Sequence, residues 1–206
     1  MAGATRLVVA TTNQNKLREI RGIVTGVDVE LVGLEAFPRA AEPEETGCTF
    51  AENARQKAAY YSTALGVPVV AEDSGLEIDG LGGAPGVESA RFGGGAAPTY
   101  PQKFELVYRG LRERGALGCP ARFVCSLAVA DGLRILFEAR GTVEGRISDA
   151  PAGEGGFGYD PIFFYPPLGR TLAQLGEDEK ARVSHRGQAF RQLREYLAAH
   201  PALLQR

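Results

Sequence analysis

The first third of the chain alternates apolar and polar stretches in a way that predicts a strand, a loop and a helix. Residues 7–10 form a short apolar run, and polar residues follow at once over 11–16. Leu17, Ile20 and Ile23 then recur at the spacing of one helix face. A helix that begins directly after such a loop presents backbone N–H groups and the positive end of its dipole, which favour anions.

A second helix is predicted from residue 49 onward. Thr49 and Glu52 fit a capping box, in which the two side chains satisfy the first free N–H groups of a helix. Apolar positions then recur along one face, and Lys57 falls close to that face. The apolar run over 67–71 predicts the next strand, which we expect to end in the acid, hydroxyl and turn residues of 72–75.

The second half of the chain predicts a hairpin between glycine-rich loops. Residues 121–131 alternate apolar and polar positions, and 133–147 continue as an antiparallel partner. Strands that alternate with helices early in the chain, followed by this hairpin, favour an α/β protein with a mixed sheet. The other predicted segments are a helix around 104–111, loops over 80–86 and 153–158, an apolar run over 162–164, and helical segments over 172–183 and 184–197.

Composition narrows the class of protein. The 206 residues are 44% hydrophobic and 23% charged, which excludes collagenous, coiled-coil and disordered chains. The length predicts a single domain over 1–206, built as one body or as two tightly joined lobes. The formal net charge of −2 provides no global positive field, so broad binding to duplex nucleic acid is not expected.

The cysteines and the N-terminus indicate a cellular compartment. Cys48, Cys119 and Cys125 form no CxxC pair, and an odd number argues against a disulfide framework, so reduced buried thiols are expected. The N-terminus turns polar too soon for a signal peptide, and no apolar run reaches the length of a membrane span. We therefore expect a cytoplasmic protein with no membrane partner.

The polar loop of residues 11–16 has two interpretations. Its short polar side chains, its backbone donors and the ammonium of Lys16 would form a cradle for phosphate groups. It lacks the GxxxxGK[ST] spacing of a Walker A loop. The same residues would also make an ordinary polar start of a helix, and the pattern alone leaves both interpretations open.

Acidic residues cluster at two places. Glu72 and Asp73 follow an apolar strand, where open α/β sheets place ligands, and neighbours in a strand point to opposite faces. One of the two, together with substrate phosphates, would suit Mg²⁺; the alternative is a turn with solvated acids. Glu42, Glu44 and Glu45 would supply a further ligand or form a charged loop. A phosphatase of the haloacid-dehalogenase type is disfavoured, because a glycine stands where it needs a second aspartate.

Two further segments carry candidate base-binding groups. Phe157 lies between glycines and could be a platform on which a base stacks, with Asp160 as a polar anchor. Lys180, His185 and Arg186 gather cations near a predicted helix start, where they could contact a base edge or a phosphate. The alternatives are a core aromatic residue for the first segment and an exposed helix cap for the second.

The order of these motifs resembles a known family. TxNxxK, ENAxxKA, EDSGL, LGGAPGVxSAR, GGFGYDPIF and SHRGxA follow one another along the chain. In the identity and order of these motifs the chain resembles the inosine triphosphate pyrophosphatase family, the XTP/dITP diphosphatases, over residues 7–197. The resemblance implies a long mixed β-sheet flanked by helices, with two lobes around a central nucleotide-binding cleft. It also implies hydrolysis of ITP, dITP and XTP to the monophosphate and pyrophosphate, which cleanses the nucleotide pool.

The resemblance implies a role for each matching residue. Asp73 would be the general base and a metal ligand, Mg²⁺ the cofactor, and Glu44 or Glu45 the second metal ligand. Two positions depart from the usual pattern, because Thr12 stands where glycine is common and Glu72 where aspartate is common. The implied substrate contacts are Thr11, Thr12, Asn13, Gln14, Asn15, Lys16 and Lys57 for the triphosphate, with Gln14 and Asn15 acting through the backbone, and Ser74, Phe157, Gly158, Tyr159, Asp160, Lys180, His185 and Arg186 for the rest of the nucleotide.

The resemblance further implies a homodimer, with no nucleic-acid partner. Two alternatives stay open beside this enzyme. One is a non-catalytic nucleotide sensor on the same scaffold, which would bind without turnover. The other is a hydrolase of the same reaction type that acts on a different pyrophosphate-containing substrate.

Overall fold

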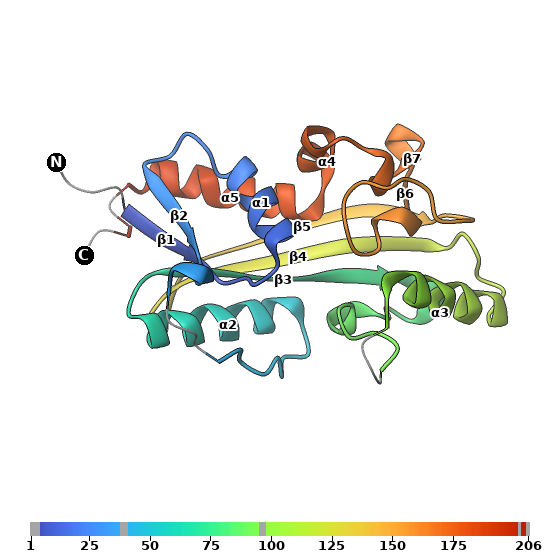
Figure 1. Ribbon diagram of the computed structural model, residues 1–206, viewed down its shortest axis with the longest axis horizontal. Helices are drawn as coiled ribbons and strands as arrows, with labels where there is room; N and C mark the ends of the chain where they lie inside the picture. The colour runs from blue at the N-terminus through green and yellow to red at the C-terminus, as the bar shows by residue number, and fades with distance from the viewer. Residues whose placement is uncertain (1–4, 38–40, 95–97, 202, 205–206) are drawn as a thin grey trace. The chain divides into compact units, whose positions relative to one another are not determined.

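The strands form one mixed sheet in the order β2-β1-β3-β4-β5-β6-β7 (Figure 1). The structure is a computed structural model that describes residues 5–37, 41–94, 98–201 and 203–204. β1 pairs in parallel with β2 and β3, and β6 pairs antiparallel with β5 and β7. The strands are β1 (Thr5–Val9), β2 (Val29–Gly33), β3 (Val69–Ile78), β4 (Pro120–Asp131), β5 (Arg134–Ile147), β6 (Phe163–Tyr165) and β7 (Arg170–Thr171).

Helices flank this sheet, so the expected α/β class with a long mixed sheet is confirmed. The α-helices of the described residues are α1 (Gln14–Ile23), α2 (Phe50–Leu65), α3 (Tyr100–Glu113), α4 (Glu177–Val183) and α5 (His185–Ala199). Each lies where the apolar periodicity predicts a helical segment. None of the helices in these ranges is long and apolar enough to cross a bilayer.

The chain divides into two compact units. The first unit comprises residues 1–73, 125–141 and 185–206, and the second comprises 74–124 and 142–184. The boundaries fall inside β3, β4 and β5, so each of these strands contributes one part to each unit. The two units are described separately below.

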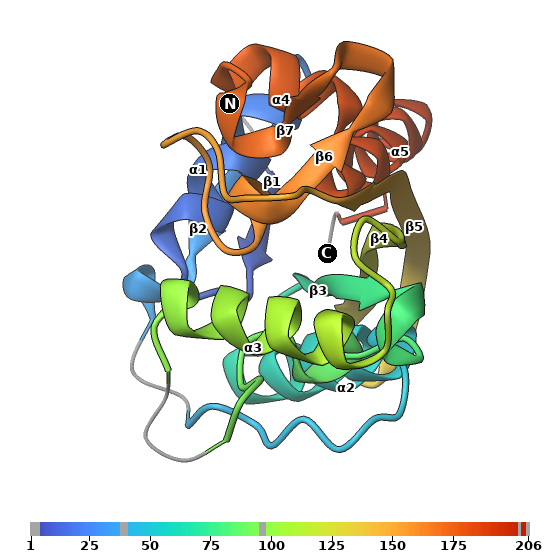
Figure 2. The same cartoon turned by 90° about the vertical axis from the view of Figure 1, so that its right-hand side faces the viewer.

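In the first unit, α2 lies on one face of the strands, and α1 and α5 lie on the other (Figures 1 and 2). The small residues Ala54 and Ala58 of α2 pack against Val8 and Val69 of the sheet. α2 begins at the predicted capping box, with Thr49 as N-cap. It ends at Gly66, whose backbone is in the left-handed conformation, which glycine adopts at little energetic cost.

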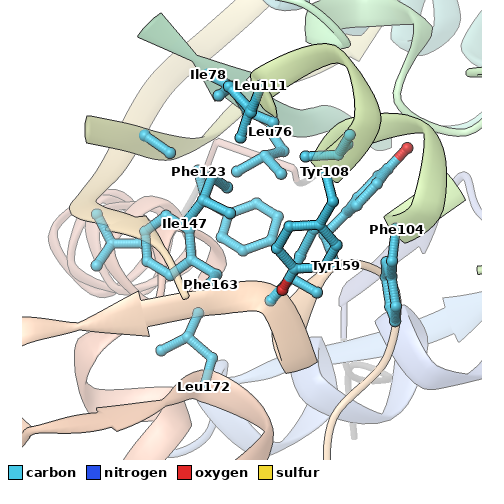
Figure 3. Close-up of a cluster of buried hydrophobic side chains, with 14 of the residues drawn as sticks. Leu76, Ile78, Phe104, Tyr108, Leu111, Phe123, Ile147, Tyr159, Phe163 and Leu172 are labelled. Carbon is cyan, nitrogen blue, oxygen red and sulfur yellow. The ribbon is translucent and has the colours of Figure 1, made fainter. Parts of the chain in front are cut away.

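In the second unit, an aromatic and aliphatic core fills the space between α3 and the strands (Figure 3). α3 contributes Phe104, Tyr108 and Leu111, which recur on one face as the sequence predicts. The rings of Phe123 and Phe163 lie with centroids 4.7 Å apart at the centre of this core. Large aromatic side chains supply much of the buried apolar area in such a core.

The strand predicted from the apolar run over 67–71 is expected to end at residues 72–75. That prediction is wrong, because the strand, β3, runs on to Ile78. Gly75 is not a turn residue here. It lacks a side chain because a Cβ would collide with the Ser89 hydroxyl and the Gly86 carbonyl oxygen. The Ser89 hydroxyl also accepts the N–H of Leu76 at 2.9 Å. The adjacent acids, residues 72 and 73, therefore lie in the middle of a strand.

The cysteines are all free thiols, as expected. Cys125 is fully buried in β4, in agreement with the prediction of buried thiols, whereas Cys119 is half-buried. The prediction is wrong for Cys48, which is exposed just before α2.

Candidate active site

The polar loop before α1 is a helix cap built by its own side chains. Asn13 is the N-cap residue, and its Oδ1 accepts the N–H groups of Asn15 at 3.0 Å and Lys16 at 3.2 Å. The Thr11 hydroxyl accepts the N–H of Asn13 at 3.1 Å. The Asn15 N–H, expected to serve substrate, is thus already bonded within the loop. Residues 12–15 are nevertheless exposed, so a ligand can approach the loop from solvent.

A buried carboxylate, Glu72, gathers three donors in the first unit. Its Oε1 lies 2.8 Å from Lys16 Nζ and 3.2 Å from Arg186 Nη2, and its Oε2 accepts from Cys125 Sγ at 3.1 Å. Arg186 also binds Glu19 Oε2 through Nη1 at 2.6 Å. Burial alone would raise the pKa of Glu72, but Arg186 and Lys16 outweigh it and hold that pKa well below its usual range. Glu72 is therefore ionised at neutral pH.

A second acidic group surrounds Lys57 on α2. Lys57 Nζ lies 2.7 Å from Glu45 Oε1 and 3.4 Å from Asp73 Oδ1. Asn53, one helical turn before Lys57, donates Nδ2–H to Asp73 Oδ2 at 2.9 Å and accepts the Gly47 N–H at 2.8 Å. This helix turn holds both the strand carboxylate and the loop that carries Glu45.

The pKa of Asp73 is shifted in the opposite direction to that of Glu72. Burial, together with the nearby charges of Glu45 and Glu72, raises the pKa of Asp73, although Lys57 and Asn53 act to lower it. Burial also disfavours the charged form of Lys57, but Asp73 and Glu45 outweigh this, so the pKa of Lys57 is raised. Asp73 thus accepts a proton more readily than an ordinary aspartate does.

Glu72 and Asp73 serve opposite faces of β3, as the alternation of a strand predicts. Glu72 meets the residues of α1 and α5, and Asp73 meets the residues of α2, which lies on the other side of the strands (Figure 1). The two residues as a whole are 4% and 6% exposed, which contradicts the alternative of a turn with solvated acids.

A divalent cation fits the oxygen donors around Lys57 better than those elsewhere in this unit. Two carboxylates, Glu45 and Asp73, already converge on the single cation Lys57, whereas Glu44 is exposed. Mg²⁺ is commonly held by one or two carboxylates, with phosphates and water completing its shell. A dedicated cage is not present, since no three acidic, histidine or cysteine side chains gather at any point in the described ranges.

In the second unit, Asp160 organises the predicted base-binding loop. Asp160 is 2% exposed, accepts the N–H of Phe157 at 2.8 Å and pairs with Lys180 Nζ at 2.7 Å. The Lys180 ammonium also lies 4.7 Å from the centre of the half-buried Phe157 ring. Gly156 has a φ of +68°, and a Cβ there would strike the Asp160 carboxylate. The acid therefore fixes both the loop backbone and the cation beside the ring.

Several predicted site residues are buried or half-buried. Tyr159 is buried among core aromatics, and its hydroxyl donates to the Ser89 carbonyl at 3.0 Å. His185 and Arg186 begin α5 and are 5% and 1% exposed, so the alternative of an exposed helix cap is wrong. Ser74 is half-buried in β3, and Gly158 is half-buried in the loop.

Three contributing residues are not identified from the sequence pattern. Asn53 belongs to the ENAxxKA motif and precedes Lys57 by four positions, so helical spacing could have indicated it. Glu19 follows Lys16 by three positions in α1 and carries a similar signal. Cys125 reads only as an apolar position of a strand, and no local signal marks it.

Comparison with known proteins identifies the family of the chain. The sequence pattern of the Ham1 family matches residues 7–196. The chain belongs to the Ham1 family. A dITP/XTP pyrophosphatase from Exiguobacterium sp. is 46% identical over 191 residues, which cover 91% of this chain and 94% of that protein. A dITP/XTP pyrophosphatase from Thermus thermophilus is 46% identical and covers 92% and 90%.

A solved structure of a Ham1 protein has a similar fold. The HAM1 protein from Coxiella burnetii superposes with a TM-score of 0.86 at 36% sequence identity, covering 94% of this chain and 98% of that chain. The Ham1 assignment thus agrees in sequence and in fold.

We predict that Glu72→Gln lowers the free energy of unfolding at neutral pH by about 3–5 kcal/mol, because the buried ion pair with Arg186 and the ion pair with Lys16 are both broken, although Arg186 keeps its pair with Glu19. The folded-state pKa of Glu72 lies below the ordinary value of 4.5. The carboxylate therefore stabilises the fold above that value, and this contribution is lost as the pH falls through the folded-state pKa. Chemical denaturation over a pH series should show the two proteins converging in acid.

The exposed ion pair of Glu30 with Arg6 provides a matched control. Glu30→Gln should change the free energy of unfolding by less than about 1 kcal/mol at every pH, because exposed pairs contribute little. Equal losses in Glu72→Gln and Glu30→Gln would contradict the role assigned to the buried carboxylate.

Proposed function

We propose that the chain hydrolyses purine nucleoside triphosphates with deaminated bases, namely ITP, dITP and XTP, to the nucleoside monophosphate and pyrophosphate. The observation that carries the proposal is the buried Asp73 carboxylate, held by Asn53 and Lys57 beside Glu45. The dITP/XTP pyrophosphatases that are 46% identical to this chain support dITP and XTP as substrates. A raised pKa and a neighbouring ammonium together suit an acid that must accept a proton near phosphate groups.

In the proposed reaction, Asp73 accepts a proton from the water that attacks the α-phosphorus. The bond from that phosphorus to the bridging oxygen breaks, and pyrophosphate leaves. Lys16 and Lys57 offset the negative charge of the triphosphate. These local cations are needed because a chain of net charge −2 has no overall positive field. Asn53 keeps the Asp73 carboxylate in place through Oδ2, while Oδ1 lies 3.4 Å from Lys57 Nζ.

We propose Mg²⁺ as the cofactor, held by Glu45 and Asp73. The choice of Glu45 over Glu44 rests on exposure, because Glu45 is drawn in against Lys57 and Glu44 faces solvent. When bound, the ion would neutralise charge on the substrate phosphates and the departing pyrophosphate.

Recognition of the base is proposed to depend on hydrogen-bond donors. Inosine and xanthine carry an acceptor at position 6, whereas adenine carries an amino donor there, and unpaired buried donors would penalise adenine. Both terminal nitrogens of Arg186 already bind Glu19 and Glu72. We therefore assign base reading to His185 and to the backbone N–H groups of Gly156 and Gly158, with Phe157 as the stacking surface.

Three further expectations accompany this function as proposals. The chain would act as one catalytic domain over 1–206, as a homodimer, and in the cytoplasm, where the nucleotide pool that it cleanses is used. The resemblance of the ordered motifs to the pyrophosphatase family supports the homodimer, the chain length supports the single domain, and the free cysteines support the cytoplasm.

Purified protein with Mg²⁺ should convert ITP, dITP or XTP to the monophosphate and pyrophosphate, and ATP much more slowly, because adenine leaves base-reading donors unpaired. A nucleotide panel scored by product identity measures this, with and without Mg²⁺. Orthophosphate with nucleoside diphosphate as products would contradict the proposal. Binding without turnover would favour the sensor, and turnover of another pyrophosphate compound alone would favour the second alternative.

Asp73→Asn should lower kcat by about 10²- to 10⁴-fold, because the general base is lost while the shape of the side chain is kept. Its free energy of unfolding should be unchanged or higher, since burial disfavours the ionised carboxylate in the folded state. Asp79→Asn, in an exposed ion pair with Arg122, is the control and should keep normal turnover. Turnover close to wild type in Asp73→Asn would remove Asp73 from the role of base.

Glu44 and Glu45 offer a matched pair for the metal. Glu45→Gln should raise the Mg²⁺ concentration that gives half-maximal turnover by about tenfold or more, because a direct oxygen ligand loses its charge. Glu44→Gln should leave that concentration unchanged. Steady-state rates over a Mg²⁺ titration provide the measurement, and a larger shift in Glu44→Gln than in Glu45→Gln would reverse the assignment.

A further inference from the structure

A thiol that the proposed reaction does not use lies against the buried acid of the first unit. Cys125 is 0% exposed in β4, and its Sγ lies 3.1 Å from Glu72 Oε2. Burial and the adjacent Glu72 raise the pKa of this thiol well above its usual range, so it is protonated. Cys125 is therefore a neutral donor, and Glu72 is its acceptor.

The two oxygens of Glu72 have separate tasks. Oε2 accepts from the Cys125 thiol, and Oε1 binds Lys16 Nζ at 2.8 Å and Arg186 Nη2 at 3.2 Å. A carboxylate is planar, so a hydrogen bond that fixes one oxygen also fixes the direction of the other. The thiol thus sets the orientation in which Glu72 presents Oε1 to the two cations.

Of these two cations, only Lys16 reaches the surface. The Lys16 side chain is 21% exposed, whereas the side chains of Glu72 and Arg186 are each 2% exposed. Lys16 also belongs to the first turn of α1, beside the exposed polar loop at 11–15. A lysine side chain loses considerable rotamer freedom when it is fixed, so a tether that fixes it in advance lowers the cost of binding an anion.

We propose that Cys125 is a positioning residue, which acts through Glu72 to hold the Lys16 ammonium ready for the triphosphate of the substrate. The proposal rests on the proposed function in assigning phosphate binding to Lys16. In this role the thiol acts only as a hydrogen-bond donor, and no bond to sulfur forms or breaks. It also separates positioning from charge, because replacing the thiol leaves the charges of Glu72, Lys16 and Arg186 unchanged.

The first test compares Cys125→Ala, which removes the donor, with Cys125→Ser, which keeps one. Cys125→Ala should raise the KM for dITP about fivefold to tenfold with kcat within about twofold, because a buried carboxylate oxygen is left unsatisfied and reorients. Cys125→Ser should restore most of the affinity. Cys119→Ala, at a half-buried thiol of the second unit, is the control and should leave both constants unchanged. Cys125→Val serves as a second variant without a donor if the alanine variant does not fold.

A double-mutant cycle decides whether the effect passes through Lys16. In a Lys16→Met background, Cys125→Ala should change KM no further, because the group that it positions is absent. An equal rise of KM with and without Lys16 would overturn the proposal, as would an unchanged KM in both donor-free variants or a failure of serine to restore it.

Binding of inorganic tripolyphosphate, measured by titration calorimetry on the same proteins, separates this proposal from the function on which it rests. Loss of affinity in Cys125→Ala, recovery in Cys125→Ser and no further loss beyond Lys16→Met would support positioning even if dITP were not hydrolysed. Normal hydrolysis of dITP with tripolyphosphate affinity insensitive to residue 125 would overturn the positioning role and leave the function intact. No tripolyphosphate binding by the wild-type protein would also overturn it.

Discussion

Strand β3 carries two adjacent carboxylates in its buried middle, and the pleat forces them to opposite faces of the sheet. Each acid must therefore find its own compensating donors in a different layer of helices. Glu72 is compensated by Lys16 and Arg186 from α1 and α5, and Asp73 by Lys57 and Asn53 from α2. The positions of the first turn of α1 and of the middle of α2 follow from this requirement.

The unequal compensation of the two acids gives them different chemistry. Glu72 has two cations and a thiol, and its pKa is held well below the usual range. Asp73 shares one cation with Glu45, and burial raises its pKa. Neighbouring acids whose pKa values are driven apart in this way commonly divide into a permanently charged group and a group that exchanges protons. The fold thus makes Glu72 a fixed charge and makes Asp73 the easier of the two acids to protonate.

Local features of the fold could be predicted from the sequence because their causes are local. The capping box of Thr49 with Glu52 and the apolar face of α3 depend on residues within a few positions of one another. The course of β3 past Gly75 could not be predicted, because it depends on Ser89 from another segment of the chain. The same holds for the pair of Arg186 with Glu72, whose partners are 114 positions apart.

The candidate site likewise contains residues that the sequence predicts and residues that it does not. Motif order indicated the chemistry of Lys16, Lys57 and Asp73, and the alternation of a strand separated Glu72 from Asp73. Helical spacing from Lys57 could indicate Asn53 as a site residue, but its bond to Asp73 could not be predicted, because the partner of a polar residue on a buried helix face depends on the strand that it meets. Cys125 was equally hidden, because a thiol on an apolar strand face looks like any small hydrophobic residue until its neighbour is known.

In both units a buried acid fixes a lysine ammonium, which belongs to the partly exposed Lys16 in the first unit and to the buried Lys180 in the second. Glu72 holds the Lys16 ammonium in the first unit, and Asp160 holds the backbone of Phe157 and the Lys180 ammonium in the second. Lysine side chains and glycine-rich loops are flexible, so fixing them only on arrival of a ligand would weaken binding. A carboxylate buried beneath each group moves that entropic cost into folding, where the rest of the core offsets it. The chain can therefore place its few cations accurately for a polyanion while its net charge stays close to zero.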